Sequence, residues 1–329
     1  MHPELFTIPF TALTVKSYGT MMVIGFLTAV FFIRKLSKNI TPDPQYIINA
    51  ALYSLIAGVV GGRLFYVIHY FENFKGDLLS VFAIWQGGLE LLGGVLLAIT
   101  VIILHLRYHK QPIRQYLDIL AVALMMALAF GRIGCFLNGC CYGKPTNLPW
   151  AVRFPYDSYA YRSQVSADPE RNRLEPQLKL PDEFFGYCDK TGDYFSGLKP
   201  YDKLSEWQKN QVNKGPYRCL PVHPTQLYSS LNAVFLCGVL WFFWHRYEGK
   251  KKKPKKYFAK PGCTFGLMFV VYGITRFLIE FIRDDNPYGF DGLTVSQNIC
   301  IGMIILGFAM MVAFHFIEPK MRINNTTKK

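Results

Sequence analysis

The chain has 329 residues, of which 51% are hydrophobic and 16% aromatic, and its formal net charge is +14. The apolar residues are gathered into several separate long runs, which excludes an ordinary soluble helical protein. The positive charge alone would suit nucleic-acid binding, but the basic residues stand beside the apolar runs, so we expect no nucleic-acid partner.

Seven apolar runs are long enough to cross a hydrocarbon core of about 30 Å, which takes about 20 residues. They cover residues 18–34, 46–68, 88–106, 117–137, 226–245, 263–282 and 294–316. Several contain glycine, which membrane helices tolerate well. We therefore predict an all-α polytopic membrane protein with seven transmembrane helices.

The charged residues between the runs predict an orientation. Basic residues gather after the first, third, fifth and seventh runs, at 34–38, 107–114, 246–260 and 320–329. The loops after the even-numbered runs mix basic and acidic residues. This positive-inside pattern predicts an N-terminus outside and a C-terminus in the cytoplasm. We expect the lysine run at 250–256 to fix this topology and to contact anionic lipids at the cytoplasmic face.

A long polar segment separates the fourth and fifth runs and gives the chain three divisions. Residues 1–137 hold spans one to four, residues 138–225 form an extracytoplasmic loop or head insertion, and residues 226–329 hold spans five to seven with a basic loop and tail. We expect the insertion to be a small, irregular head domain with short strands such as 149–155. A flexible insertion is the alternative.

Eight cysteines occur in the chain, three of them in CFLNGCC at 135–141. This segment lacks both CxxC spacing and a neighbouring histidine, so we expect no metal and no cofactor there. For Cys140 and Cys141 we favour packing or a mutual structural role over nucleophilic catalysis. Cys188 and Cys219 fall in the predicted outer insertion, where a disulfide is permitted. Three further cysteines lie within or beside apolar runs and are expected to pack there: Cys237, Cys263 and Cys300.

The sixth run carries a polar stripe. Tyr272, Arg276, Glu280 and Arg283 follow helical spacing, so they share one face of an otherwise apolar helix. Such a face must point into the bundle or a wet cavity rather than toward lipid. We expect Glu280 to neutralise Arg276 or Arg283 in part and to hold the guanidinium in place. A purely structural ion pair is the alternative.

Two more arginines lie within apolar runs, each beside glycine: Arg63 in GGRLFYVI and Arg132 in GRIG. Glu90 lies between two glycine pairs and is a partner for Arg63. An arginine in a span is costly unless it pairs or faces a polar cavity. Since acidic partners are few and Arg suits bidentate phosphate binding, the arginines predict a cavity for a phosphate ester.

Several segments resemble the prolipoprotein diacylglyceryl transferase family, in the family's order and over most of the chain. The matching segments are SYG with GFL at 17–27, GGRLFYVI at 61–68, GGLELLGG at 87–94, GRIGCFLNGCCYG at 131–143, HPTQLY at 223–228 and YGITRFLIEFIRDD at 272–285. The family pattern GR-x-G-N-F-x-N-x-E-x-x-G is matched at six positions: Gly131, Arg132, Gly134, Phe136, Asn138 and Gly143.

The resemblance implies that the chain alkylates sulfur. A diacylglyceryl group would pass from phosphatidylglycerol to the lipobox cysteine in the signal peptide of a prolipoprotein, and glycerol phosphate would leave. The enzyme would sit in the bacterial inner membrane, with its active site near the outer leaflet. No cofactor is implied.

The resemblance also assigns roles to residues of this chain. Arg132 and Arg276 would hold the phosphate, Glu280 would position Arg276, and His223 is the candidate base. Five residues would contribute to substrate binding: Tyr18, Arg63, Asn138, Gly143 and Tyr272. Of these, Arg63 is equally suited to a structural pairing with Glu90, which we favour.

Three positions depart from the family pattern. Cys135 and Cys140 replace an asparagine and a glutamate, and Leu92 stands where the family often has a histidine. A catalytically silent lipid- or lipoprotein-binding protein of the same fold is therefore one alternative function. A transporter of an anionic solute is another, although the chain shows no internal repeat and no matching broken helices.

Overall fold

The computed structural model describes residues 4–7, 14–40, 45–75, 78–83, 87–188, 194–248, 260–289 and 292–317. The basic run at 250–256 and the tail beyond 317 lie outside the described residues. Seven long helices carry the fold: α1 (Ser17–Ser37), α2 (Gln45–His69), α3 (Leu91–Tyr108), α4 (Ile113–Asn138), α7 (Thr225–Glu248), α8 (Cys263–Glu280) and α9 (Val295–Phe316).

Two short helices and two small hairpins complete the regular structure. The helices are α5 (Tyr159–Val165) and α6 (Glu206–Asn213), and the strands are β1 (Glu4–Thr7), β2 (Thr14–Lys16), β3 (Phe185–Cys188) and β4 (Tyr194–Leu198). Each hairpin is antiparallel and irregular; in the second, Phe185 pairs with Leu198 and Tyr187 with Phe195. Short 3-10 turns lie at 71–74, 78–82, 169–171, 182–184 and 201–203.

Six of the long helices are long and apolar enough to cross a membrane. The helix at the predicted third span is shorter in its apolar part, Leu92–Tyr108. It begins at Leu91 rather than at 88 because Gly87 and Gly88 have φ values of 90° and 75°, which a right-handed helix cannot contain. A mostly helical polytopic membrane fold is therefore confirmed, and among the described residues six helices have the length and composition of a span.

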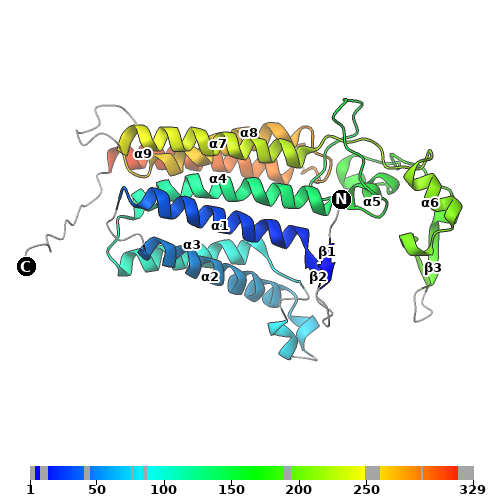
Figure 1. Ribbon diagram of the computed structural model, residues 1–329, viewed down its shortest axis with the longest axis horizontal. Coiled ribbons are helices and arrows are strands. Elements are labelled where there is room, and N and C mark those ends of the chain that lie inside the picture. The colour runs from blue at the N-terminus through cyan, green and yellow to red at the C-terminus, as the bar shows by residue number, and fades with distance from the viewer. Residues whose placement is uncertain are drawn as a thin grey trace, which may run out of the picture. The chain divides into compact units, whose positions relative to one another are not determined.

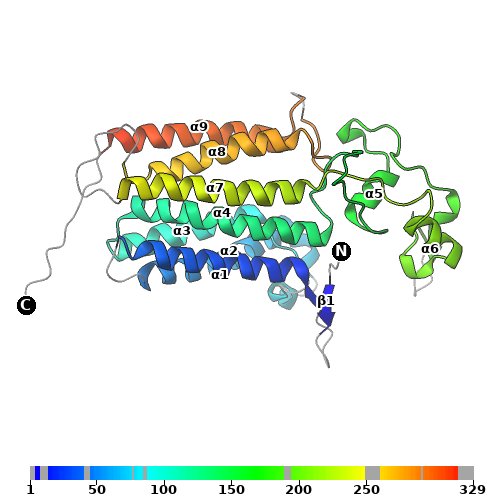
Figure 2. The ribbon, with the colours of Figure 1, turned by 45° about the horizontal axis from the view of Figure 1, so that its top comes forward.

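The chain divides into two compact units, which are described separately. The first holds residues 1–27, 124–239 and 266–309, and the second holds residues 28–123, 240–265 and 310–329. Figures 1 and 2 show the helices from which both units draw their residues.

In the first unit, small residues and single polar contacts bring successive helices together. A methyl group on Gly25 of α1 would lie 3.0 Å from the carbonyl oxygen of Ala127 on α4. Ser230 on α7 donates to the carbonyl of Ala129 at 2.9 Å, and Asn232 donates to Thr275 on α8 at 3.0 Å. Close backbone approach at small residues is typical of helix packing in membranes.

In the second unit, α2 and α3 meet along a glycine seam. A methyl group on Gly61 would lie 2.5 Å from the carbonyl oxygen of Gly93, and one on Gly94 would lie 2.8 Å from that of Gly58. His105 of α3 also contacts the carbonyl of Tyr46 at 3.1 Å. The two backbones can approach this closely because each helix has glycine at these contacts.

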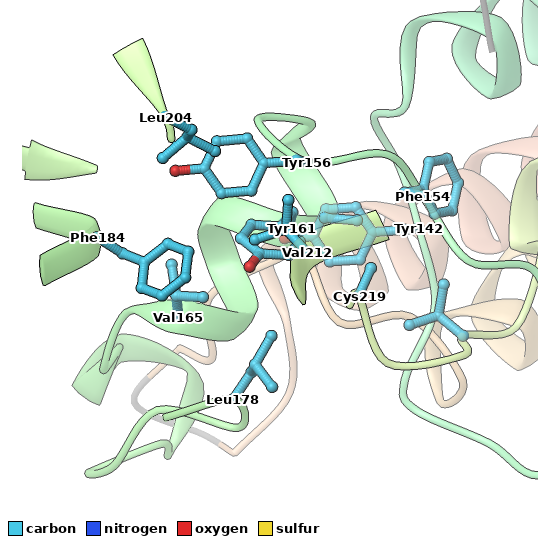
Figure 3. Packing of buried hydrophobic residues seen from close by; sticks show 12 residues of the cluster. Tyr142, Phe154, Tyr156, Tyr161, Val165, Leu178, Phe184, Leu204, Val212 and Cys219 are labelled. Carbon is cyan, nitrogen blue, oxygen red and sulfur yellow. The ribbon is translucent and has the colours of Figure 1, made fainter. Parts of the chain in front are cut away.

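The segment between α4 and α7 packs its own core within the first unit. Figure 3 shows the aromatic rings around which it is built. The cluster is formed by Tyr142, Phe154, Tyr156, Ala160, Tyr161, Val165, Leu178, Phe184, Leu204, Val212, Cys219 and Val222. Buried hydroxyls are satisfied by backbone, as where Tyr161 donates to the carbonyl of Tyr217 at 2.7 Å. A packed core of this kind argues against the flexible insertion.

The predicted strand at 149–155 is wrong. Only Val152 pairs, through a single bridge with Val222. Pro149 and Pro155 stand at the two ends of this segment and have no N–H to donate, so a strand ladder cannot continue through them. The short helices that do form are capped by Ser158 and Ser205, the latter in a reciprocal capping box with Gln208.

Candidate active site

Arg132 lies on the last turns of α4 and is half-buried. Its guanidinium makes no hydrogen bond and no ion pair with the residues that the structure describes. It lies within electrostatic range of Tyr272, Cys135, Cys141 and Arg283. A buried cation without a carboxylate partner keeps its hydrogen-bond donors for a ligand.

Tyr18 of α1 faces the same region. It lies within electrostatic range of Arg132 and of Cys135, and its backbone packs against Gly134, where an added methyl group would be 3.4 Å from its Cα atom. The structure therefore brings together three residues predicted from sequence, Arg132, Tyr18 and Tyr272.

Arg276 and Glu280 form an ion pair one turn apart on α8, and both are buried. Glu280 also accepts from Thr294 at 2.9 Å and from the amide of Asn286. Ser296 accepts from Arg276 at 3.3 Å. The carboxylate of Glu280 thus has several donors, which fixes the position of the Arg276 guanidinium.

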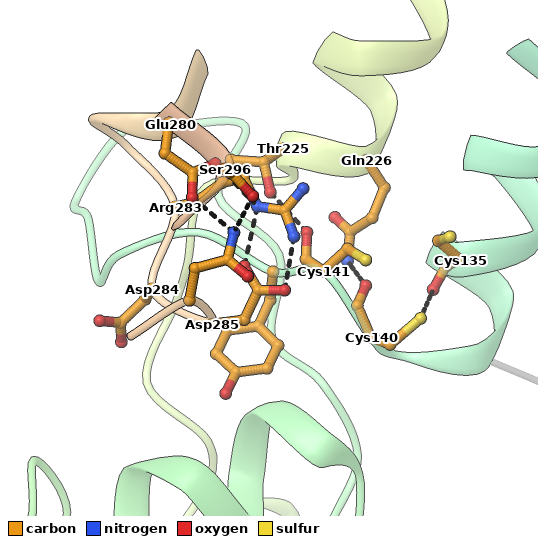
Figure 4. A network of polar contacts seen from close by, with 12 residues as sticks. Cys135, Cys140, Cys141, Thr225, Gln226, Glu280, Arg283, Asp284, Asp285 and Ser296 are labelled. Carbon is orange, nitrogen blue, oxygen red and sulfur yellow. Dashed lines mark hydrogen bonds and ion pairs between the residues drawn. The ribbon is translucent and has the colours of Figure 1, made fainter. Parts of the chain in front are cut away.

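Arg283 lies close both to Arg132 and to the Arg276–Glu280 ion pair. Its Nε atom is 2.8 Å from Asp285 Oδ1 and 3.6 Å from Glu280 Oε2. Figure 4 shows this guanidinium between the carboxylates and the turn that follows α4. Asp285 was not predicted from sequence. Its only signal was its place two residues after the last arginine of the stripe.

Guanidinium groups outnumber carboxylates in this site. The three guanidiniums of Arg132, Arg276 and Arg283 stand against the two carboxylates of Glu280 and Asp285. Because both carboxylates are committed to Arg276 and Arg283, Arg132 is left without a carboxylate partner within the described part of the site. An anion is the ligand that this arrangement favours.

The turn after α4 reverses the chain sharply. Gly139 and Cys141 have φ values of 75° and 61°. The hydroxyl of Thr225 donates to the carbonyl of Cys141 at 2.7 Å, and the amide of Gln226 donates to the carbonyl of Cys140 at 2.7 Å. A non-glycine residue keeps a left-handed conformation only where its surroundings hold it, and these two bonds do so.

This turn gathers three thiols that the sequence spacing did not associate with a metal site. The Sγ atoms of Cys135, Cys140 and Cys141 all lie within 4.8 Å of one another. Hydrogen bonds from the Cys135 and Cys140 thiols, together with the nearby guanidiniums of Arg283 and Arg132, hold the pKa of the Cys141 thiol well below its ordinary value. The expectation of simple packing is therefore incomplete.

The other predicted residues of this unit have different surroundings. Asn138 ends α4, and its side chain hydrogen-bonds to the thiol of Cys140. Gly143 is enclosed, because an added methyl group would lie 2.7 Å from atoms of His223, Thr225 and Ile282. Its surroundings therefore leave no room for a side chain. His223 Nδ1 lies 3.4 Å from the hydroxyl of Tyr228.

Arg63, in the second unit, differs from the prediction. Its guanidinium donates to four backbone carbonyls, those of Ser80, Val81, Gly87 and Gly88, at 2.7 to 3.1 Å. The expected pairing of Arg63 with Glu90 is wrong, because Glu90 contacts His69 at 2.7 Å instead. The backbone acceptors come from a turn region that carries no acidic side chain to indicate them in the sequence.

Two cavities open beside the site in the first unit. One, of about 350 Å³, is lined by Cys140, Cys141 and Asp285 and by residues of the head segment. The other, of about 260 Å³, is lined by Glu280 and Arg283 and by further head residues that include Arg171 and Arg173. Both give access from the head segment to the charged groups.

The fold and this site define a polytopic helical membrane protein with a cluster of arginines on its membrane helices. A family model described as prolipoprotein diacylglyceryl transferase matches residues 3–313. The chain belongs to the prolipoprotein diacylglyceryl transferase family. It is thus a multi-pass membrane protein of a transferase family.

Relatives from three bacterial genera carry the same name, phosphatidylglycerol–prolipoprotein diacylglyceryl transferase. The protein of Buchnera aphidicola is 32% identical over 319 residues, 94% of this chain and 95% of the relative. That of Burkholderia multivorans is 30% identical over 312 residues, 91% and 90% of the two chains. That of Clostridium tetani is 27% identical over 307 residues, 93% and 95%.

Proposed function

We propose that the chain transfers the diacylglyceryl group of phosphatidylglycerol to the lipobox cysteine of a prolipoprotein signal peptide. The product is a thioether, and glycerol phosphate is released. The observation that carries the proposal is the guanidinium of Arg132, half-buried on a membrane helix and without a carboxylate partner among the described residues. In a member of this family, such a group suits the phosphate of an anionic lipid.

The reaction is a substitution at carbon. The cysteine thiol loses its proton, its sulfur attacks the glyceryl carbon that carries the phosphate ester, and an S–C bond replaces the C–O bond. The electron pair of the broken bond leaves with glycerol phosphate. Arg132 and Arg276 stabilise the charge that grows on this leaving group, and they do so best away from bulk water.

The remaining residues take supporting roles. Glu280 positions Arg276 through their ion pair. Tyr18, Tyr272 and Asn138 orient the head group. The substrate proton passes to His223, because the position of the family's histidine in α3 is occupied by Leu92, an exposed apolar side chain. The contacts of Arg63 with backbone carbonyls favour a structural role for it.

The topology follows from the same proposal. We take α3 to be a seventh, short span, with the N-terminus outside and the C-terminus in the cytoplasm, in the bacterial inner membrane. The basic loop after α7 then faces the anionic lipids of the cytoplasmic leaflet. The active site, at the other end of α4 and α8, lies near the outer leaflet, where prolipoproteins present their lipobox.

The test is transfer by purified protein in phosphatidylglycerol vesicles to a peptide with a lipobox cysteine. We expect the peptide to gain the mass of one diacylglyceryl group as glycerol phosphate appears. A peptide with serine in place of that cysteine is the control. Bound lipid without a mass gain in the peptide would instead support a catalytically silent lipid-binding protein. The departures from the family pattern at Leu92, Cys135 and Cys140 favour that alternative. Movement of an anion across the vesicle without lipid consumption would support a transporter.

A further inference from the structure

The three thiols of Cys135, Cys140 and Cys141 have the geometry of a metal site. Their Sγ atoms lie within 4.8 Å of one another. Three thiolates around one tetrahedral zinc ion, with Zn–S bonds of about 2.3 Å, stand about 3.8 Å apart. The observed Sγ atoms are therefore at most about 1 Å farther apart than that arrangement requires.

The backbone around the thiols is held in place. Cys140 N donates to the carbonyl of Cys135 at 3.2 Å, which closes the end of α4. Thr225 and Gln226 fix the next two carbonyls, and Cys141 keeps its φ of 61°. The helix end and the turn therefore present all three sulfurs to one point, as a preformed ligand set requires.

The surroundings suit a thiolate-bound cation. Zinc with three thiolates has a net charge of −1, and Arg132 and Arg283 both lie within electrostatic range of Cys141. The cavity of about 350 Å³ is lined by Cys140 and Cys141, so an ion and a further ligand can enter. A disulfide would use two of the thiols and leave the third unexplained, whereas one cation uses all three.

We propose that Cys135, Cys140 and Cys141 bind one zinc ion and leave its fourth position open to the thiol of the lipobox cysteine. The three-ligand, one-open arrangement is that of catalytic rather than structural zinc. The part that concerns the lipobox cysteine rests on the proposed function; the binding of the ion itself does not.

The chemistry balances without a redox partner. The lipobox thiol binds zinc and gives its proton to His223. The zinc-bound sulfur then donates an electron pair to the glyceryl carbon as the C–O bond to phosphate breaks. A metal ion deprotonates a coordinating thiol outright, so this site supplies the activation that the missing α3 histidine would otherwise give. The thioether product carries no charge, binds zinc weakly and leaves.

The first experiment measures metal, not turnover. Full-length protein in detergent is loaded with zinc, passed through a desalting column and assayed for zinc by mass spectrometry. We expect about one ion per chain, as for a single four-coordinate site. Cys135→Ser, Cys140→Ser and Cys141→Ser should each lose it, and Cys188→Ser, at an exposed cysteine, should keep it. The double variant Cys135→Asn with Cys140→Glu, which restores family residues, should fold and lose the ion.

The second experiment tests whether the peptide binds at the fourth coordination position of the metal, with cobalt(II) loaded in place of zinc. In detergent without phosphatidylglycerol, no transfer is possible. The visible absorption of the cobalt protein should change on addition of the lipobox peptide and stay constant with its serine analogue.

Several outcomes overturn the proposal. They are wild-type protein without metal, metal retained in the three serine variants, a disulfide between two of the three cysteines, or a cobalt spectrum indifferent to the peptide. Transfer by metal-free protein would overturn the zinc inference and leave the proposed function standing. A cobalt spectrum that changes with the peptide, together with no transfer in phosphatidylglycerol vesicles, would support the metal site and overturn the proposed function.

Discussion

Arg63 and Arg132 are both membrane-helix arginines preceded by glycine, yet their surroundings are opposite. The guanidinium of Arg63 is buried, donates to four backbone carbonyls and lies 5.3 Å from the ring centre of Phe74. The guanidinium of Arg132 has no hydrogen-bond partner among the residues with described positions, and its neighbours are two tyrosines, thiols and a second cation.

The hydrogen-bond partners of the two arginines distinguish a structural role from a functional one. An arginine whose donors are mostly satisfied by its own fold stabilises that fold, and truncating it leaves carbonyls without that donor. An arginine whose donors are free in the fold carries a desolvation cost, which a bound ligand can offset. Sequence context does not distinguish the two, since both follow glycine in apolar runs.

The largest effect is expected at Arg132. Replacing it with alanine should lower the rate of diacylglyceryl transfer by about 10² to 10³-fold, since a donor to the charge of the transition state is lost. The thermal unfolding temperature should hardly change, because no hydrogen bond to a described residue is broken. Transfer assays and thermal scans on the same sample measure both. If Arg132→Ala instead lowered the unfolding temperature strongly and left transfer normal, Arg132 would have a structural role like that of Arg63.

Arg63→Ala should produce the opposite pattern. Four backbone carbonyls would lose their donor, and loss of a single hydrogen bond to a charged group costs about 1.5 to 3 kcal/mol. The protein should unfold at a lower temperature or accumulate poorly, while the folded fraction transfers lipid at a near-normal rate. Arg63→Lys, with three donors on a narrower head, serves as an intermediate control. Normal stability and lost transfer would instead identify Arg63 as a substrate ligand.

Glu280→Gln tests the ion pairs of Arg276 and Arg283, and its effect should lie between those at Arg132 and Arg63. Arg276 and Arg283 share this carboxylate, so both guanidiniums should shift, and a misplaced catalytic group costs up to about 100-fold in rate. Stability should fall as well, because buried cations lose a partner. Glu90→Gln is the matched control, since its contact with His69 is partly exposed and contributes little. Equal behaviour of the two variants would contradict the proposed positioning role.

A tyrosine pair gives the smallest contrast. Tyr272 lies within electrostatic range of Arg132, and Tyr66 lies beside Arg63 with the ring centre 5.5 Å from the guanidinium carbon. Tyr272→Phe removes a hydroxyl assigned to head-group binding and should slow transfer by roughly 2- to 10-fold, the value of one hydrogen bond. Tyr66→Phe keeps the ring and should leave both transfer and stability unchanged. Transfer rates at several lipid concentrations distinguish the two variants.

Much of the fold could be predicted from the sequence because membrane helices are defined by apolar length. The fourth predicted run, 117–137, lies within the observed α4, Ile113–Asn138, and the sixth begins at Cys263 as predicted. The polar stripe of α8 was also predictable, since helical spacing alone places Arg276 one turn before Glu280. Cys237, Cys263 and Cys300 are buried, as expected for apolar packers.

The parts that escaped prediction depend on backbone turns rather than on periodicity. The four acceptors of Arg63 are carbonyl groups, which every sequence has. The thiol cluster depends on the left-handed turn at Gly139 and Cys141, which folds residues 140 and 141 back toward Cys135. Linear spacing was the basis for expecting no metal there, and linear spacing does not include that reversal.

The glycine seam of α2 and α3 has a consequence for biosynthesis. Gly58, Gly61, Gly93 and Gly94 bring two helices that are consecutive in the chain into antiparallel backbone contact. The 18 residues of α3 span about 27 Å at 1.5 Å per residue, slightly less than the bilayer core. A helix this short gains from leaving the translocon already docked on its predecessor. The two helices are therefore expected to insert as one unit.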